Sequence, residues 1–261
     1  MRRPVPSKRI AAKERIAAKE RLAADERTAA SIVVEDASKV IDGVTVLDGV
    51  SFSALPGRVT AFVGPNGAGK TTTLRAILGI DHLTSGRATI GGRPFREHRR
   101  PVQVAGAVLT AEAAHPRRTA RGHLTVVAAS NGLCHSSVDA MLDLVGIAEI
   151  ADLPVGQMSL GMRQRLALGT ALIGDPTVLI LDEPHNGLDA GAIRWLRVVL
   201  RMLADGGRTV LVSTHLMSEI EAFCDDVVVI DRGRIVMAGP LGHFVGGTTM
   251  EQRYLDMVER G

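Results

Sequence analysis

Nine consecutive residues have the types and the spacing needed to hold a phosphate chain. They are Gly64, Pro65, Asn66, Gly67, Ala68, Gly69, Lys70, Thr71 and Thr72. Glycines allow the backbone to curl so that successive N–H groups point inward, and the N-terminus of the following helix adds positive potential. Lys70 supplies an ammonium group and Thr71 a hydroxyl for Mg²⁺. The stretch predicts a cradle for a polyphosphate with its Mg²⁺, and an ordinary glycine-rich turn is the alternative.

Two adjacent carboxylates, Asp182 and Glu183, follow an apolar run farther along the chain. Carboxylates at the carboxyl edge of a parallel sheet face the crevice in which ligands bind. Asp182 can hold Mg²⁺ together with Thr71, and Glu183 can orient or deprotonate a water that attacks the terminal phosphate. His215 follows another apolar run and can hydrogen-bond a phosphate oxygen. The candidate catalytic residues are Glu183, His215 and Lys70, and a plain loop is the alternative for the two carboxylates.

A serine that opens a predicted helix forms a second candidate anion site. Ser159 is placed to cap the N-terminus of this helix, and Gly161 allows a ligand to approach the backbone closely. Because helix N-termini attract anions, this position predicts a further contact with phosphate. An ordinary capped helix is the alternative interpretation.

The segments around these residues alternate between strand-like and helix-like patterns. Candidate strands are residues 32–34, 44–47, 59–63, 178–181, 209–212, 227–230 and 235–237, and candidate helices are residues 72–78, 190–203 and 217–223. Strands that alternate with helices around a phosphate loop predict an α/β fold with a mostly parallel sheet. We expect a main domain over residues 32–245, a mostly helical sub-domain inserted at about 94–170, an extension at 1–31 and a tail at 246–261.

The N-terminal extension accounts for the positive net charge of +3. Residues 1–31 carry 9 Lys and Arg against 4 Asp and Glu, a net charge of +5, so residues 32–261 carry 22 against 24, a net charge of −2. The extension repeats a six-residue unit. On an α-helix, the apolar residue of each unit is rotated by about 600° from that of the preceding unit, so these residues form no continuous apolar stripe. A solvated helical or partly disordered tail is one interpretation, and a basic arm for membrane phosphates or nucleic acid is the other.

The bulk composition favours a folded cytosolic protein. The chain has 261 residues, of which 46% are hydrophobic and 3% aromatic, and its N-terminus lacks the apolar run of a signal peptide. We find no apolar run long enough to span a bilayer. The two cysteines, Cys134 and Cys224, are far apart in the sequence and are expected to be reduced. With few aromatic residues and no basic excess in the main domain, no nucleic-acid partner is expected.

Three motifs resemble those of the ATP-binding cassette (ABC) transporter ATPases. Residues 158–166, Met-Ser-Leu-Gly-Met-Arg-Gln-Arg-Leu, are similar to the signature motif of that family, and residues 181–189, Leu-Asp-Glu-Pro-His-Asn-Gly-Leu-Asp, resemble its Walker B strand and D-loop. Residues 213–215, Ser-Thr-His, resemble its switch-histidine segment. The motifs follow one another in the family's order, and the resemblance covers about residues 32–244. Within the family, residues 119–124 look like those of actinobacterial exporters of the bacitracin or daunorubicin resistance type.

The resemblance implies a P-loop NTPase core with an N-terminal β subdomain and an inserted helical subdomain. It implies that two cassettes pair head to tail around two ATP molecules with Mg²⁺, the phosphate loop of each facing the signature of the other. The signature residues are then Ser159, Leu160, Gly161 and Gln164, and Asp189 belongs to the D-loop. The implied function is ATP hydrolysis that powers export. The implied partners are a second ABC ATPase subunit and integral membrane permease subunits, at the cytoplasmic face of the cell membrane.

The sequence departs from the family pattern at two positions. Ile41 stands where such cassettes usually stack an aromatic residue on adenine, so stacking is replaced by apolar contact and discrimination of ATP from GTP is predicted to be weak. Thr110 stands where the Q-loop glutamine is expected, with Glu112 as a possible substitute. That loop normally contacts Mg²⁺ and signals to the membrane subunit. The departure at Thr110 therefore affects the coupling between this chain and the membrane subunit.

Two other functions remain open from the sequence. One is a soluble ABC-type ATPase that acts on nucleic acid or ribosomes through the basic arm, although such proteins usually carry two cassettes or a long coiled-coil insertion. The other is a nucleotide-binding regulatory subunit that hydrolyses ATP weakly, for which Ile41 and Thr110 are the reason.

Overall fold

The computed structural model of the chain describes residues 31–112, 114–134, 136–215, 220–244, 249 and 251–254. The predictions for residues 1–31 and 246–261 lie almost wholly outside this part, as do residues 217–219 of the expected helix at 217–223. Among the described residues, no helix combines the length and the hydropathy needed to cross a membrane.

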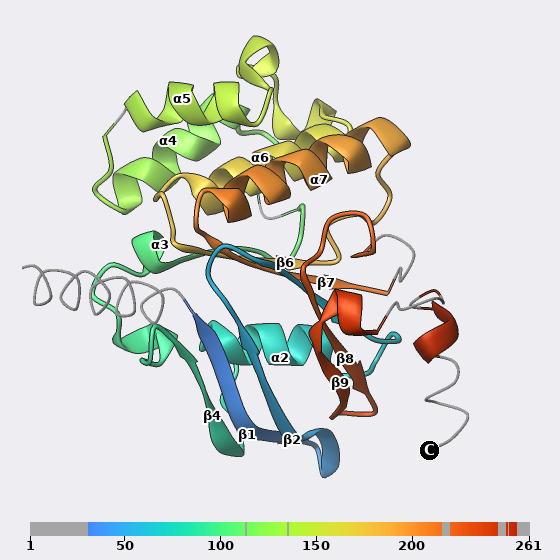
Figure 1. Ribbon diagram of the computed structural model, residues 1–261. Helices are drawn as coiled ribbons and strands as arrows, with labels where there is room; N and C mark the ends of the chain where they lie inside the picture. Colours follow the sequence, from blue (N-terminus) through green and yellow to red (C-terminus); the bar gives the residue numbers. More distant parts are fainter. Residues whose placement is uncertain are drawn as a thin grey trace, which may run out of the picture.

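Two β-sheets form the framework of the described chain (Figure 1). The first sheet contains β1 (Ile32–Ile41), β2 (Val44–Ala54) and β4 (Ser85–Ile90) in the order β2-β1-β4. The second sheet contains β3 (Val59–Val63), β5 (Ala105–Val108), β6 (Val178–Asp182), β7 (Thr209–Thr214), β8 (Asp226–Asp231) and β9 (Arg234–Pro240), in the order β5-β6-β7-β3-β8-β9. The first sheet is antiparallel, and in the second only the β8–β9 pair is antiparallel.

The central strands of the second sheet are covered on both faces. Every residue of β3 and β7 is buried, as are the first four residues of β6. Continuous apolar burial of this kind is typical of a parallel sheet between two layers of helices. The α/β fold with a mostly parallel sheet, predicted from the sequence, is confirmed.

Helices lie on both faces of this sheet (Figure 1). They are α2 (Lys70–Ile77), α3 (Pro101–Val104), α4 (Ala120–Ser130), α5 (Ser136–Leu144), α6 (Leu160–Leu172) and α7 (Ala190–Asp205). Four short 3-10 turns are η1 (Phe95–Glu97), η2 (Ala148–Ile150), η3 (Val155–Gln157) and η4 (Leu241–His243). Helix α2 lies between the two sheets, whereas α6 and α7 cover the opposite face and carry α4 and α5 as an outer layer.

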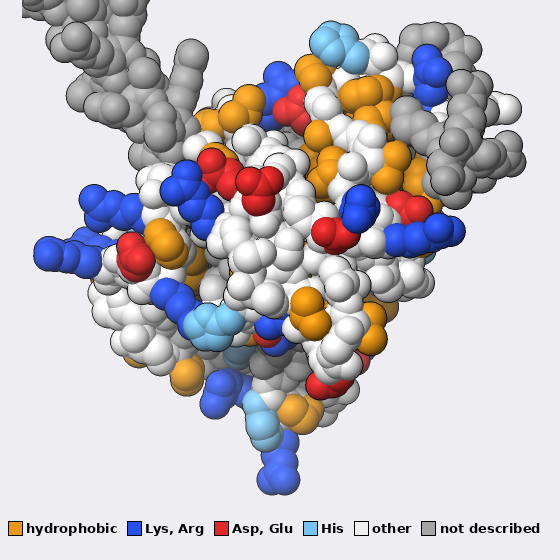
Figure 2. All heavy atoms as spheres, turned by 90° about the horizontal axis from the view of Figure 1, so that it is seen from below, with side chains coloured by type: hydrophobic (Ala, Val, Ile, Leu, Met, Phe, Trp, Pro, Cys, Tyr) orange, Lys and Arg blue, Asp and Glu red, His pale blue; other side chains and the backbone are white. Residues whose placement is uncertain are grey.

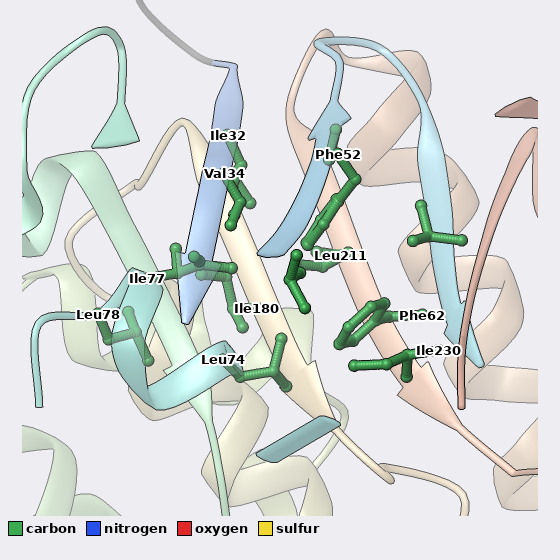
Figure 3. Packing of buried hydrophobic residues seen from close by; sticks show 14 of the residues in the cluster. Ile32, Val34, Phe52, Phe62, Leu74, Ile77, Leu78, Ile180, Leu211 and Ile230 are labelled. Atoms are coloured by element: carbon green, nitrogen blue, oxygen red, sulfur yellow. The ribbon is translucent and has the colours of Figure 1, made fainter. Parts of the chain in front are cut away.

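The core beneath α2 joins both sheets (Figure 3). The rings of Phe52, from β2, and Phe62, from β3, stack with their centroids 5.0 Å apart. Leu74 and Ile77 of α2 are fully or almost fully buried against this cluster, which Leu211 of β7 also enters. This packing fixes the N-terminus of α2 beside the carboxyl ends of β3 and β6.

Helices α4, α5 and α6 form a separate apolar cluster. Leu124, Leu142 and Leu166 are each at most 1% exposed within it. The guanidinium of Arg165, on α6, lies 3.9 Å from the ring centroid of Trp195, on α7. A cation over an indole ring is attracted by the ring's negative face, so this contact ties the outer helical layer to the layer on the sheet.

The structure differs from the prediction at residues 105–108. This segment was included in the mostly helical region from 94 to 170, but it forms β5, a parallel edge strand paired with β6. A Cβ at Gly106 would lie 1.9 Å from the carbonyl oxygen of Ala171, so glycine there permits the close approach of α6. Because alanine and glycine have low strand propensity, the run Ala-Gly-Ala-Val gives little local signal for a strand.

One face of the molecule, seen from below in the view of Figure 1, carries charged side chains of both signs (Figure 2). Basic and acidic groups lie close together there, with hydrophobic side chains between them. Such mixing is typical of a solvated protein surface.

Candidate functional site

The loop between β3 and α2 is the predicted phosphate cradle. Gly67 (φ 82) and Gly69 (φ 107) adopt left-handed backbone conformations, which favour glycine. A Cβ at Gly64 would lie 2.2 Å from the carbonyl oxygen of Ile230, so a larger residue would disturb the contact with β8. The exposed residues of the loop are Pro65, Asn66 and Gly67, whereas Gly64, Ala68 and Gly69 are buried.

Helix α2 begins directly after this loop, and no side chain caps its N-terminus. Gly69 is the N-cap residue, and the first turn, which includes Thr72, contains no acidic residue. The free N–H groups and the helix dipole therefore leave positive potential at this end of the helix. An anion such as phosphate is stabilised at that position.

Two polar side chains at the start of α2 reach the end of β6. The ammonium of Lys70 is 6% exposed, donates to the carbonyl oxygen of Gly64 at 2.7 Å and lies 3.1 Å from Oε1 of Glu183. The hydroxyl of Thr71 donates to Oδ2 of Asp182 at 2.7 Å. The structure thus brings the phosphate loop and both predicted carboxylates together.

The histidine after β7 completes this group. Nδ1 of His215 lies 2.5 Å from Oε2 of Glu183, whose side chain is 18% exposed. Burial acts to raise the pKa of Glu183, but hydrogen bonds from His215 and Lys70 outweigh it and lower the pKa below its usual value. Glu183 is therefore ionised at neutral pH.

The donor atoms suit Mg²⁺. The ion prefers oxygen ligands and is usually bound by one or two protein groups together with substrate phosphates and water. The hydroxyl of Thr71 and the carboxylate of Asp182 lie within hydrogen-bond distance of each other, at 2.7 Å, beside the phosphate loop. Among the described residues no cluster of three His, Cys, Asp or Glu could hold a metal by itself.

The predicted signature residues lie at the start of α6. Ser159 is exposed and caps the helix, its hydroxyl accepting from the N–H of Met162 at 3.2 Å. Leu160 and Gly161 are partly exposed, whereas Gln164 is only 6% exposed. Within the described part of the chain, no hydrogen bond or ion pair connects these residues to the loop at 64–72.

The start of α7 lies beside the start of α6. Asp189 caps α7 through a 2.7 Å bond from the N–H of Ala192. A Cβ at Gly187, where φ is 71, would lie 2.5 Å from Cδ2 of Leu160. A Cβ at Gly161 would meet only ordinary contacts, at 3.9 Å or more. The predicted D-loop and signature therefore form one surface.

The hairpin between β1 and β2 passes close to the phosphate loop. A Cβ at Gly69 would lie 2.7 Å from Cδ2 of Leu47, on β2. At the tip of this hairpin, Ile41 pairs with Val44, and their side chains are 42% and 65% exposed. Exposed aliphatic groups can offer an apolar surface to a base but no aromatic face.

The loop after β5 borders an apolar hollow. Thr110 and Glu112 are exposed, and the N–H of Glu112 donates to the Thr110 hydroxyl at 3.2 Å. Thr110 lines a hollow of about 300 Å³ together with Leu109, His123 and Arg163. Within the described residues, no hydrogen bond or ion pair connects Thr110 or Glu112 to Asp182.

The sequence prediction missed one side chain at the centre of the site. Ser213 entered it only as part of the motif around His215, yet it is fully buried and contacts both Asp182 and Glu183. Its signal in the sequence was a serine directly after the apolar run of residues 210–212. The contacts themselves depend on the pairing of β6 with β7, which the local sequence does not specify.

Comparison with known proteins gives a consistent result. A family model described as ABC transporter matches residues 47–186. The Nod factor export ATP-binding protein I of Burkholderia lata is 39% identical over 194 residues, which are 72% of this chain and 64% of that protein. The lantibiotic transport ATP-binding protein SrtF of Streptococcus pyogenes is 36% identical over 181 residues, which are 69% of this chain and 78% of that protein. The chain thus spans slightly less than two thirds of the first relative.

Solved structures agree with the family match. A structure described as the ATP-binding subunit of an ABC transporter aligns with 87% of this chain at a TM-score of 0.79 and 26% identity, and 99% of that chain is covered. CbiO1 of Clostridium perfringens, described as part of the ABC transporter complex CbiONQ, aligns with 88% of this chain at a TM-score of 0.73 and 26% identity, and 94% of it is covered.

Proposed function

Because this chain belongs to the ABC transporter family of ATP-binding proteins, we propose that it is the ATP-hydrolysing subunit of a membrane exporter. The observation that supports this most strongly is the connected set of polar groups at the end of the parallel sheet. Lys70 and Thr71 from the phosphate loop contact Glu183 and Asp182 from the end of β6, and His215 contacts Glu183. A phosphate, a metal ion and a general base can meet there.

The loop and helix α2 bind and orient the phosphates in this proposal. Backbone N–H groups of residues 64–72 and the N-terminus of α2 attract the negative charge. A terminal phosphate competes with Glu183 for the ammonium of Lys70, so binding it releases Glu183 from that ion pair. The freed carboxylate is then available to a water molecule.

The two carboxylates have different tasks. Thr71 and Asp182 would hold Mg²⁺, which supplies charge neutralisation at the phosphate oxygens. Glu183 accepts the proton of the attacking water, because its lowered pKa keeps it ionised. His215 donates its Nδ1–H to Glu183 and so orients the carboxylate.

A second cassette completes the site. The signature lies at a helix N-terminus, where Ser159 is exposed and Gly161 partly exposed, and within the described residues it makes no polar contact with the phosphate loop of its own chain. Head-to-tail pairing would place this positive helix end against the phosphates held by another subunit. The D-loop at Asp189, beside the signature, then lies at the same interface.

Membrane subunits are the other proposed partners. The loop at Thr110 and Glu112 borders an apolar hollow between the sheet and the outer helical layer, where a segment of a membrane subunit can dock. Two relatives are named for Nod factor export and lantibiotic transport, which supports export as the direction. The exported solute would be selected by the membrane subunits, and this chain would work at the cytoplasmic face of the membrane.

We expect ATP hydrolysis to require Mg²⁺ and the carboxylate of Asp182. In Asp182→Asn the metal loses a charged ligand, so turnover should fall about 100-fold. Phosphate release measured across a Mg²⁺ titration tests this. The matched control is Asp152→Asn, whose side chain is 81% exposed in the native protein, and which should leave turnover unchanged. Undiminished hydrolysis in excess EDTA, or by Asp182→Asn, would contradict the proposal.

We expect the protein to use ATP and GTP with similar efficiency. Ile41 offers only aliphatic contact to a base, and an aromatic ring there should tighten nucleotide binding about three- to tenfold. Comparing kcat/KM for ATP and GTP in the wild type and in Ile41→Tyr tests this, with Val236→Tyr, 43% exposed on β9, as the control. A strong preference for ATP that Ile41→Tyr leaves unchanged would reject the assignment of Ile41 to the base site.

A further inference from the structure

A buried hydroxyl connects the carboxylate of Asp182 to the backbone of Glu183. Ser213, on β7, is 0% exposed, and its strand register places it directly opposite Asp182 on β6. The remainder of β7 from Val210 to Val212 is apolar and packs in the core. Hydrogen bonds compensate for the free-energy cost of burying such a hydroxyl, so its partners are the groups that it ties together.

The hydroxyl group makes two hydrogen bonds at once. It donates its proton to Oδ1 of Asp182, and it accepts the backbone N–H of Glu183 at 2.9 Å. A serine hydroxyl has one proton to donate and lone pairs to accept, so both bonds form without conflict. Ser213 therefore connects the side chain of one carboxylate residue to the backbone of the next.

The bond to Asp182 sets the orientation of its carboxylate. With Oδ1 held by Ser213, the second oxygen, Oδ2, faces the hydroxyl of Thr71 at 2.7 Å. Rotation about the terminal bond of an aspartate is otherwise soft. Ser213 thus keeps one oxygen of Asp182 directed at the residue with which it would hold the metal.

The bond to Glu183 stabilises an uncommon backbone conformation. Glu183 has a φ of 48, in the left-handed region that residues other than glycine rarely adopt. The backbone N–H of Glu183 donates to the hydroxyl of Ser213, and its nitrogen also lies 3.2 Å from the carbonyl oxygen of Ser213. This backbone turn places the Glu183 side chain between Lys70 and His215.

We propose that Ser213 is a positioning residue that fixes both Asp182 and Glu183 for hydrolysis. The inference rests on the proposed ATPase function but adds a residue to it. Ser213 touches neither phosphate nor metal in this scheme. It acts through the carboxylates, and its loss should lower the rate of the chemical step more than the affinity for ATP.

The test compares Ser213→Ala with Ser213→Thr in the full-length protein. Alanine removes both bonds and leaves room, so we expect kcat to fall about tenfold or more, because small misplacements of catalytic groups are costly. KM for ATP should change less than about threefold, since the phosphate loop is untouched. Threonine restores the hydroxyl and should recover most of kcat. Melting temperatures of all variants are measured in parallel.

Thr60→Val is the matched control for the loss of a buried hydroxyl. Thr60 is also 0% exposed, on the neighbouring strand β3, and its Oγ1 has no hydrogen-bond partner in the described structure. This change should leave kcat within about twofold. An equal loss of kcat in Thr60→Val and Ser213→Ala would overturn the proposal, because general disturbance of the sheet would then explain both.

Two further results would also overturn it. These are a Ser213→Ala variant with kcat within twofold of the wild type, and a folded Ser213→Thr variant no more active than Ser213→Ala. If Ser213→Thr melts well below the wild type, the comparison of kcat between Ser213→Ala and Thr60→Val decides whether the proposal holds. A wild type without turnover would reject the proposed function instead. The role of Ser213 would then be tested by measuring ATP affinity with and without Mg²⁺. We expect Mg²⁺ to increase the affinity less in Ser213→Ala than in the wild type.

Discussion

Glu183→Gln will bind ATP with nearly unchanged affinity and lose about three orders of magnitude of turnover. The amide keeps the size of the side chain, and its single carbonyl oxygen can still accept from Lys70 or from His215, but it cannot accept the proton of the attacking water. General-base catalysis contributes about 10²- to 10⁴-fold to enzymatic rates, so its loss should dominate the effect. Steady-state phosphate release and equilibrium ATP binding measure the two quantities separately.

The role of general base makes Glu183 the residue with the largest expected effect. Its carboxylate is ionised at neutral pH because the hydrogen bonds from His215 and Lys70 outweigh the influence of burial. The control is Glu149→Gln, an exposed position on the outer helical layer. Turnover of Glu183→Gln equal to that of the wild type would exclude Glu183 as the base, and a parallel loss of ATP binding would indicate that the site had been disturbed.

Local sequence patterns predicted the chemical groups of the site because these groups stand at strand ends. The phosphate loop follows β3, the carboxylates follow β6 and His215 follows β7, all at one edge of a parallel sheet. The carboxyl ends of parallel strands lie at the same edge of a sheet whatever the order of the strands. These groups can therefore be placed together without knowing that order. The structure accordingly brings Lys70, Thr71, Asp182, Glu183 and His215 together.

Features that depend on pairing between distant segments were not predicted. The role of Ser213 requires the register in which it lies opposite Asp182, and a shift by one residue would turn its side chain to the other face. Strand β5 was missed because Ala-Gly-Ala-Val has a low propensity to form a strand. The segment is nevertheless a strand, because it pairs at the edge of the sheet and because Gly106 allows α6 to approach closely. Tertiary context outweighs local propensity in both cases.

A second subunit should complete the site of this chain. In the presence of ATP, Glu183→Gln will form dimers, because bound nucleotide that is not hydrolysed keeps the two halves of the site together. Adding Gly161→Glu to this variant will keep it monomeric, since a carboxylate at the start of α6 repels the phosphates of the partner. Light scattering after gel filtration, with and without ATP, measures both states. In the wild-type background, Gly161→Glu should lower turnover about 100-fold while ATP still binds.

Gly161 is suited to this test because its substitution leaves the fold of its own chain undisturbed. A Cβ at this position would meet only atoms at 3.9 Å or beyond, and no polar contact of the described residues connects it to the phosphate loop. Gly242→Glu, at an exposed position with nothing within 4 Å of an added Cβ, is the control and should still dimerise. If Glu183→Gln stays monomeric with ATP, the completing subunit is not a second copy of this chain. If Gly161→Glu hydrolyses ATP like the wild type, the signature does not take part in the site at all.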